Sequence, residues 1–267
     1  MSAVGTSPRL RYNIPMSIYG RYAEIYDRSG QIAFGLRMIP YLDEVLQRHP
    51  VSGRSLLDLA CGTGTVALSF ARQGWEVYGV DGSASMLAQA RHKAQETNLL
   101  LALSQQDMRS FRLPHRVALV TCLYDSLNYM LTLDDLSQVF QRVSEVLLPG
   151  GLFLGDMNTQ EMIEHDWDNN TFFVDGHDLA VVLQSEYDPQ TRIGTVHLVG
   201  FEQQADVLYS RFDEEHAEIA YSDSATQAAL EGAGLRVEAA YQCFGFAPPD
   251  AETRRILWVA RKPEAQA

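Results

Sequence analysis

The sequence predicts an α/β fold: a doubly wound, mixed sheet of seven strands with an antiparallel β-rich insertion after the fifth strand. Between residues 55 and 154, short apolar segments alternate with amphipathic helical segments. This alternation is typical of βαβ units and a parallel sheet. From about residue 171 the helices stop, and β-rich runs follow one another across turn signals at Asp175-Gly176 and Asp188-Pro189. That change predicts an antiparallel meander.

Caps and stops mark the elements of the first half of the chain. Gly74 is a stop for a helix that begins after a glycine turn, and Ser83 is an N-cap for the next helix. Thr132 is expected to cap a third helix, with acids in its first turn as the helix dipole prefers. The expected elements are a mostly helical stretch 19–38, strands 56–59, 75–81, 99–103, 116–122 and from 152, helices 65–73, 83–97 and 132–147, and a tight turn 148–151.

The second half divides the chain into a main domain and an insertion. Expected strands are 172–174, 179–187, 193–203 and 207–219, followed by a helix 222–231 and strands 235–241 and 255–260. We therefore expect an N-terminal arm with lid helices (1–50), a main domain (51–158 and 220–267) and an inserted subdomain (159–219). In the insertion, Trp167, Phe172 and Phe173 are expected to pack in the core of the meander, with the lining of a substrate pocket as the alternative. Glu214, Glu215 and Glu218 are expected to form a solvated edge.

Composition excludes several classes of function. The net charge is −13, from 21 basic and 34 acidic residues, which argues against nucleic acid as the main partner and favours neutral or cationic small molecules. Three widely spaced cysteines without a Cys-x-x-Cys pair suggest neither a disulfide framework nor a metal site. The sequence has no secretory signal pattern and no apolar run of the ~20 residues that span a bilayer. We therefore expect a cytoplasmic protein without membrane partners.

A glycine-rich turn between Leu59 and Thr65 is the strongest local signal. Gly62 and Gly64 let the backbone turn sharply and approach a ligand, and the following helix directs its N-terminus at the same place. The turn, with Asp81 closing the next strand, loosely fits a dinucleotide fingerprint. However, Asp58 precedes the glycines inside the strand, where its charge would repel a pyrophosphate and suit an ammonium group.

Four segments together carry a resemblance to a known family. The set of 58–64 (Asp-Leu-Ala-Cys-Gly-Thr-Gly), Asp81, 106–108 (Gln-Asp-Met) and 148–151 (Leu-Pro-Gly-Gly) resembles the class I S-adenosylmethionine-dependent methyltransferases, which have a Rossmann-like fold. The resemblance covers about residues 22–156 and the last helix and two strands. Within that class, segments 22–27, 107–111 and 125–129 are similar to a small-molecule branch that includes sugar N,N-dimethyltransferases.

This resemblance implies S-adenosylmethionine as cofactor and a role for each matching residue. Asp58 would attract the methionyl ammonium, Asp81 would hold the ribose hydroxyls, and Asp107 would accept from the adenine amino group. The full expected cofactor set is Tyr22 and Tyr26 (lid), Asp58, Ala60, Gly62 and Gly64 (cradle), Asp81, Gly82, Ser83 and Met86 (adenosine), Asp107 and Met108 (adenine), and Leu123.

Methyl transfer from a sulfonium mainly needs alignment of the reactants and exclusion of water, so we expect no catalytic triad. Ligands of open α/β sheets bind beyond the carboxyl ends of the strands. This places the acceptor at residues that follow the fourth and fifth strands. They are Tyr124, Ser126, Asn128 and Asn158 as substrate residues, and Asp125 and Asp156 as catalytic candidates that attract an amine or take a proton.

The function that we expect is methyl transfer to a small-molecule acceptor, with nitrogen favoured over oxygen. Three alternatives remain open at this point: a dehydrogenase that uses NAD, a non-catalytic module that only binds the cofactor, and a methyltransferase that acts on a protein or an RNA. The insertion is expected to shape either the acceptor pocket or the interface of a homodimer.

Overall fold

The computed structural model describes residues 18–205 and 207–264, so the expected irregular arm over residues 1–15 lies outside the described part of the chain. Two sheets organise the described residues, one of seven strands and one of four. In the same part of the chain, no helix is both long enough and apolar enough to cross a membrane.

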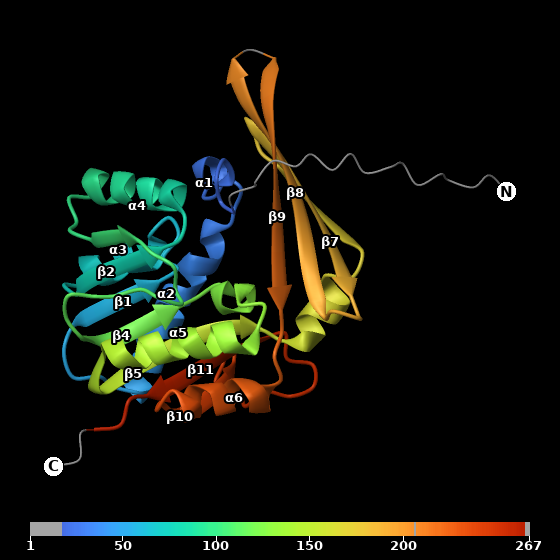
Figure 1. The fold of residues 1–267 in the computed structure, drawn as a ribbon. Helices are drawn as coiled ribbons and strands as arrows, with labels where there is room; N and C mark the ends of the chain where they lie inside the picture. The colour runs from blue at the N-terminus through green and yellow to red at the C-terminus, as the bar shows by residue number, and fades with distance from the viewer. Residues whose placement is uncertain (1–17, 206, 265–267) are drawn as a thin grey trace.

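The seven-stranded sheet has the order β10-β11-β5-β4-β1-β2-β3 (Figure 1). Neighbours from β5 to β3 pair in parallel, whereas β11 is antiparallel to both β5 and β10. This arrangement confirms the predicted mixed, doubly wound sheet. Its strands are β1 Ser55–Leu59, β2 Glu76–Asp81, β3 Ala102–Gln105, β4 Val117–Cys122, β5 Leu147–Asn158, β10 Arg236–Gln242 and β11 Arg255–Arg261.

Helices cover both faces of this sheet. One apolar cluster joins α2 (Ile32–Arg48) and α3 (Thr65–Arg72) to one face, and a second joins α5 (Leu133–Val146) and α6 (Asp223–Gly232) to the other. The expected caps form, because the hydroxyls of Ser83 and Thr132 accept from backbone N–H groups at the start of α4 (Ala84–Glu96) and α5. The short elements are α1 Tyr22–Ile25, the 3₁₀ helix η1 Ser126–Tyr129 and the π-helix η2 Met162–Asp166.

Three expected boundaries differ from the structure. The stretch 19–38 is not one helix, because a turn that includes Gly30 with φ +92° separates α1 from α2, and α2 continues through Pro40. The third strand begins at Ala102 rather than Leu99, whose N–H bonds instead to Ala94 at the end of α4. The segment 148–151 is part of β5, since Gly150 and Gly151 bond to Lys262 beyond β11.

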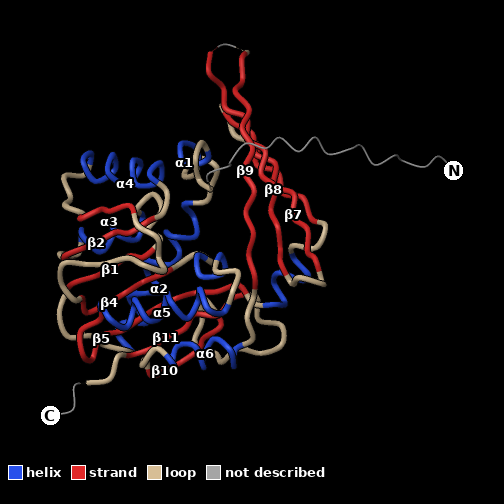
Figure 2. Tube along the Cα trace, in the orientation of Figure 1, coloured by secondary structure: helices blue, strands red, loops and turns tan. Residues whose placement is uncertain are grey.

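The insertion leaves the main sheet at the end of β5 and returns just before α6. It is an antiparallel sheet of β6 (Asn170–Asp175), β7 (Leu179–Asp188), β8 (Ile193–Ala205) and β9 (Leu208–Ile219). Figure 2 shows the long strands standing beside the lid helix α1. Tyr22 and Ile25 of α1 form a buried cluster with four insertion residues: Leu179, Val181, Leu198 and Phe212. The insertion therefore packs on α1 and the residues beside it, 18–26, which are called the lid below.

Two expectations for the insertion are wrong. Phe172 and Phe173 are 51% and 62% exposed, because neighbouring residues of a strand point to opposite faces and β6 is the outer strand of its sheet. Half-buried Trp167 does pack on the meander, against Gly194 of β8. Glu214 and Glu218 do not form a solvated edge with exposed Glu215, since both are only 3% exposed. They lie on the face of β9 that meets the lid and η1.

Substituting Gly200→Ala should destabilise the insertion. A Cβ at Gly200 would overlap the buried ring of Phe212, which packs in the cluster with α1. Overpacking of this kind costs about 1–3 kcal/mol, which urea unfolding would measure as a lower midpoint. Gly232→Ala is the matched control, because a Cβ at the end of α6 meets no atom within 4 Å. Equal midpoints for both variants would contradict the packing described here.

Candidate active site

A cavity of about 790 Å³ lies beyond the carboxyl ends of the parallel strands. This volume falls within the roughly 300–1,000 Å³ typical of small-molecule sites. Its wall comes from the segments that follow β1, β2, β3 and β4, together with residues 18–38 of the lid and α2. The cavity is therefore placed where the sequence predicts ligand binding.

The glycine turn after β1 forms one wall of the cavity. Ala60, Gly62 and Gly64 all have positive φ, at 57°, 53° and 78°, and the N–H of Gly64 bonds to the carbonyl of Cys61 at 2.8 Å. A non-glycine residue with positive φ is uncommon. A Cβ at Gly62 would meet no protein atom within 4 Å, and Gly62 lines the cavity. The turn thus presents bare backbone to the space where a ligand would lie.

Asp81 ties this turn to the next one. Its Oδ2 accepts from the N–H of Gly62 and its Oδ1 from the N–H of Ser83, both at 2.8 Å. A carboxylate has about four acceptor positions, so two positions stay available on a residue that lines the cavity. Burial raises the pKa of this carboxyl, and the two backbone N–H bonds oppose that rise.

Asp58 lies deeper, inside β1. It is buried, and its carboxylate accepts from the hydroxyl of Thr121 at 2.8 Å and from the N–H of Ala67 at 3.2 Å. Burial raises its pKa to about 7, against the two hydrogen bonds that lower it. The residue lines the cavity without a cationic partner among the described residues. An incoming ammonium group would satisfy it.

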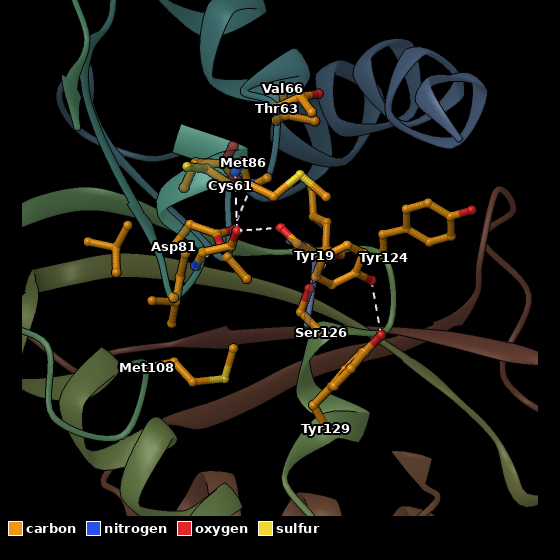
Figure 3. Close-up of a pocket in the computed structure, with 18 of the residues that line it drawn as sticks. Tyr19, Cys61, Thr63, Val66, Asp81, Met86, Met108, Tyr124, Ser126 and Tyr129 are labelled. Atoms are coloured by element: carbon orange, nitrogen blue, oxygen red, sulfur yellow. Dashed lines mark hydrogen bonds between the residues drawn. The ribbon is translucent and has the colours of Figure 1, made fainter. Parts of the chain in front are cut away.

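The segment after β3 supplies a charged pair. Asp107 and Met108 line the cavity, and so does Arg109, whose role the sequence did not predict. The guanidinium of Arg109 binds both Asp107 and Asp135, and its hydrogen bond to Asp107 holds the pKa of that carboxyl below its usual value. Gly82, Ser83 and Met86 also line the cavity, so the expected adenosine residues lie together (Figure 3).

The lid differs in detail from the expectation. Tyr26 lines the cavity, but Tyr22 does not; its ring packs against the insertion and its hydroxyl lies 3.1 Å from the Oγ of Ser29. Tyr19 takes the place at the cavity that was expected for Tyr22. Its carbonyl accepts from the hydroxyl of Ser83 at 2.8 Å, and its N–H donates to Glu214 at 2.7 Å.

The loop after β4 forms the wall opposite the glycine turn. Leu123, Tyr124 and Ser126 line the cavity as expected, and Tyr129 joins them. Figure 3 shows Tyr124, Ser126 and Tyr129 on one side of the cavity and Asp81 on the other. The ring of Phe34 stacks on Tyr124 with centroids 4.2 Å apart, which fixes this wall to α2.

Asp125, Asn128, Asp156 and Asn158 do not line the cavity, which differs from the expected contact with the acceptor. Asp156 is fully buried and accepts from the N–H groups of Tyr124 (2.6 Å) and Asp125 (3.2 Å). Arg255 binds both carboxylates. The side-chain amide of Asn128 donates to the carbonyl of Asn158, and that of Asn158 donates to Asp125. These residues hold the loop from beneath the wall.

Several cavity residues escaped prediction from the sequence. Tyr19 and Gln31 lie within the stretch 19–38, which was expected to be mostly helical, and Tyr129 ends the segment 125–129, which was similar to the small-molecule branch. Tyr19 lies in the turn before α1 and lines the cavity, whereas Tyr22 lies in α1 and packs in the buried cluster with the insertion. The sequence therefore predicted a tyrosine-bearing lid at the cavity, but it named Tyr22 where the structure has Tyr19.

Comparisons with known proteins agree with this geometry. A family model described as "Methyltransferase domain" matches residues 56–151. The putative methyltransferase YqeM of Bacillus subtilis is 30% identical over 248 residues, which are 92% of this chain and 97% of that protein. A dTDP-3-amino-3,4,6-trideoxy-α-D-glucopyranose N,N-dimethyltransferase of Streptomyces venezuelae is 29% identical over 73% of this chain and 81% of that protein.

A solved structure covers nearly the same extent. An S-adenosylmethionine-dependent methyltransferase from Clostridium acetobutylicum superposes with a TM-score of 0.82 and 26% identity, over 92% of this chain and 99% of that one. The cavity fits the cofactor on its own chemistry as well, with a bare backbone turn, free acceptor positions on Asp81 and, at Asp58, a buried acid that has no cationic partner in the described part of the chain. The chain therefore belongs to the S-adenosylmethionine-dependent methyltransferases.

Proposed function

We propose that this enzyme methylates the nitrogen of an amine on a small acceptor that carries no phosphate. The observation that supports this most directly is the charge of the cavity wall. Among the described residues that line it, Arg109 is the only basic one, and it is bound to Asp107 and Asp135. Asp58 and Asp81 stand in the same wall. Such a wall offers no free cation to a phosphate among its described residues, and its acids suit the positively charged cofactor and a neutral or cationic acceptor.

The cofactor is proposed to lie along the glycine turn. Asp81 offers its free acceptor positions to the ribose hydroxyls, and Asp107 and the N–H of Met108 meet the adenine. Asp58 faces the methionyl ammonium, directly or through water, because it is the buried acid of the cradle. The bound cofactor supplies a methyl group on a positively charged sulfur, which is already activated for transfer.

Aromatic side chains favour a nitrogen acceptor. Four tyrosines line the cavity, Tyr19, Tyr26, Tyr124 and Tyr129, and tyrosine faces attract ammonium groups. The Streptomyces venezuelae relative acts, by its name, on the amino group of a dTDP-linked sugar. The dTDP part is a diphosphate, for which this cavity wall offers no free cation among its described residues. The proposed acceptor therefore shares the amine and lacks the nucleotide.

The protein's contribution is alignment and exclusion of water. The lid closes one side of the cavity through Tyr19 and Tyr26, and the loop after β4 forms the other side through Tyr124 and Ser126. Both walls are fixed by hydrogen bonds to buried acids, Glu214 for the lid and Asp156 for the loop. Holding two reactants in line in this way removes much of the entropic barrier to displacement.

A turnover screen tests the acceptor class. Purified enzyme with S-adenosylmethionine would be offered matched acceptors: amino sugars without phosphate, their dTDP-linked forms, and phenols. We expect methylation of free amines with kcat/KM at least tenfold above that of the dTDP forms. A preference for the dTDP forms would contradict the proposal that the acceptor carries no phosphate. A preference for phenols would contradict the proposal that the methyl group is transferred to nitrogen. No turnover with any acceptor would support a non-catalytic cofactor-binding protein.

Substituting Asp81→Ala should weaken binding of S-adenosylmethionine and its demethylated product alike. Hydrogen bonds to a charged group contribute about 1.5–3 kcal/mol each, so calorimetry should show a Kd raised at least about tenfold. Glu44→Ala is the control, because Glu44 is an exposed acid on α2 outside the cavity lining. An unchanged Kd for Asp81→Ala would remove the ribose role from this residue.

Substituting Asp58→Asn should stabilise the ligand-free protein and weaken the cofactor complex. The folded pKa of about 7 lies above the ordinary 3.8, so the unfolded chain binds fewer protons and Asp58 costs stability as the pH rises between these values. Asparagine avoids this cost and keeps both hydrogen bonds, since the hydroxyl of Thr121 can also accept.

Urea unfolding should show the stability advantage of Asp58→Asn growing up to about pH 7 and then staying constant, at roughly 2–4 kcal/mol. Calorimetry at pH 8 should show a raised Kd for S-adenosylmethionine, because the charged partner of the ammonium is lost. A stability advantage that does not change with pH would contradict the raised pKa. Unchanged cofactor binding would contradict the ammonium role.

A further inference from the structure

A chain of hydrogen bonds leads from the cavity into the junction between the main domain and the insertion. The hydroxyls of Tyr19 and Tyr129, which both line the cavity, lie 2.9 Å apart (Figure 3). The hydroxyl of Tyr129 in turn lies 2.9 Å from Nδ1 of His216. His216 is 6% exposed and belongs to β9. Three separate elements, the lid, η1 and the insertion, thus supply one continuous path.

The far nitrogen of His216 is unsatisfied. Its Nε2 is buried and has no hydrogen-bond partner among the described residues. The nearest acid is Glu214, whose Oε2 lies 3.5 Å away. The same carboxylate accepts from the N–H groups of Tyr19 and Tyr22. A positive charge formed on His216 would therefore face a buried acid that is fixed in place.

The two tyrosines can carry a proton but cannot serve as the base. Burial, as the largest cause, raises the pKa of both Tyr19 and Tyr129 well above the ordinary value. A hydroxyl that stays protonated can still receive one proton while it gives another. Glu218 and Asp125 also act on Tyr129 by their charge and oppose its ionisation. The chain therefore ends at the imidazole of His216.

We propose that His216 accepts the proton that the acceptor amine must lose, and that Tyr19 and Tyr129 pass it from the cavity. This inference rests on the proposed amine acceptor. An ammonium nitrogen has no free electron pair, so it must release one proton before it can attack a methyl group. That proton moves to a tyrosine hydroxyl as the hydroxyl of Tyr129 gives its own proton to Nδ1 of His216. Both tyrosines end neutral, the nitrogen gains its electron pair, and His216 carries the charge beside Glu214.

The other acids near the cavity are less suited to this role. Asp125 and Asp156 do not line the cavity and are bound to Arg255. Glu218 accepts from the side-chain amide of Asn158 at 3.0 Å and also stays out of the lining. Charged and titratable groups that face His216 are Glu214 from its own strand, Tyr19 from the lid and Tyr129 from η1, with Glu218 and Asp125 beyond Tyr129.

The first experiment reads the tautomer of His216 and needs no acceptor. Nitrogen NMR of the full chain, labelled with ¹⁵N-histidine, would be recorded at pH 8, and the signal assigned by its loss in His216→Asn. The relay requires a neutral ring with the proton on Nε2, so that Nδ1 accepts from Tyr129. The Nδ1 shift should change in Tyr129→Phe. A proton found on Nδ1 would overturn the relay.

The second experiment follows turnover with an amine found by the screen. In His216→Asn the amide oxygen can still accept from Tyr129 but cannot take a proton. We expect kcat to fall about 10²-fold near neutral pH, and to recover at high pH, where the amine loses its proton to solvent. Tyr129→Phe should show the same pH dependence. The Kd for S-adenosylmethionine should not change in either variant. His197→Asn, at a partly exposed position on β8, is the control.

The outcomes separate the two proposals. If the wild type methylates amines and His216→Asn keeps the wild-type pH profile of kcat, the relay is overturned and the amine acceptor stands. If His216→Asn loses activity equally at every pH, the residue is structural, which also overturns the relay. If the wild type methylates no amine, the proposed function fails, whatever the tautomer of His216. If kcat of His216→Asn is lost near neutral pH and recovers at high pH, both the amine acceptor and the relay are supported.

Discussion

Three carboxylates hold the walls of the cavity, and each does so by accepting two backbone N–H groups from residues outside the strands. Asp81 binds Gly62 and Ser83, Asp156 binds Tyr124 and Asp125, and Glu214 binds Tyr19 and Tyr22. Loops that carry function must still be placed precisely, and charge-assisted hydrogen bonds are among the stronger polar interactions available. The glycine turn, the loop after β4 and the lid thus share one device, although they come from distant parts of the chain.

The acids in and around the cavity wall have separate duties. Asp156 is compensated by Arg255 and stays beneath the wall. Asp81 keeps free acceptor positions toward the cavity, and Asp58 has no cationic partner among the described residues, so burial raises its pKa. A buried acid without a partner costs stability. A ligand that carries a positive charge can offset this cost for Asp58, and the cofactor of this family carries an ammonium group.

How far the sequence predicts the site depends on the range of the contacts. The placement of Asp58, Gly62 and Asp81 at the cavity was predicted because they belong to one βαβ unit, whose geometry follows from local pattern. Gly64 was expected there too, but it does not line the cavity and instead packs close to Ala90 of α4. The role of Glu214 was not predictable, since its partners lie more than 190 residues away. Nor did alternation mark the buried face of β9, because both faces carry polar residues. Inward-facing Phe212, Glu214, His216 and Glu218 alternate with Arg211, Asp213, Glu215 and Ala217.

The insertion therefore does more than cover the cavity. Glu214 fixes the lid through Tyr19 and Tyr22 and also lies 3.5 Å from Nε2 of His216. Placement of the lid and the electrostatic surroundings of the buried imidazole are consequently set by one side chain. Displacing the lid would break the contact between Tyr19 and Tyr129 at the same moment that it opens the cavity to water. In the proposed relay, closure and proton removal are thereby linked, because the step from Tyr19 to Tyr129 exists only while the lid is in place.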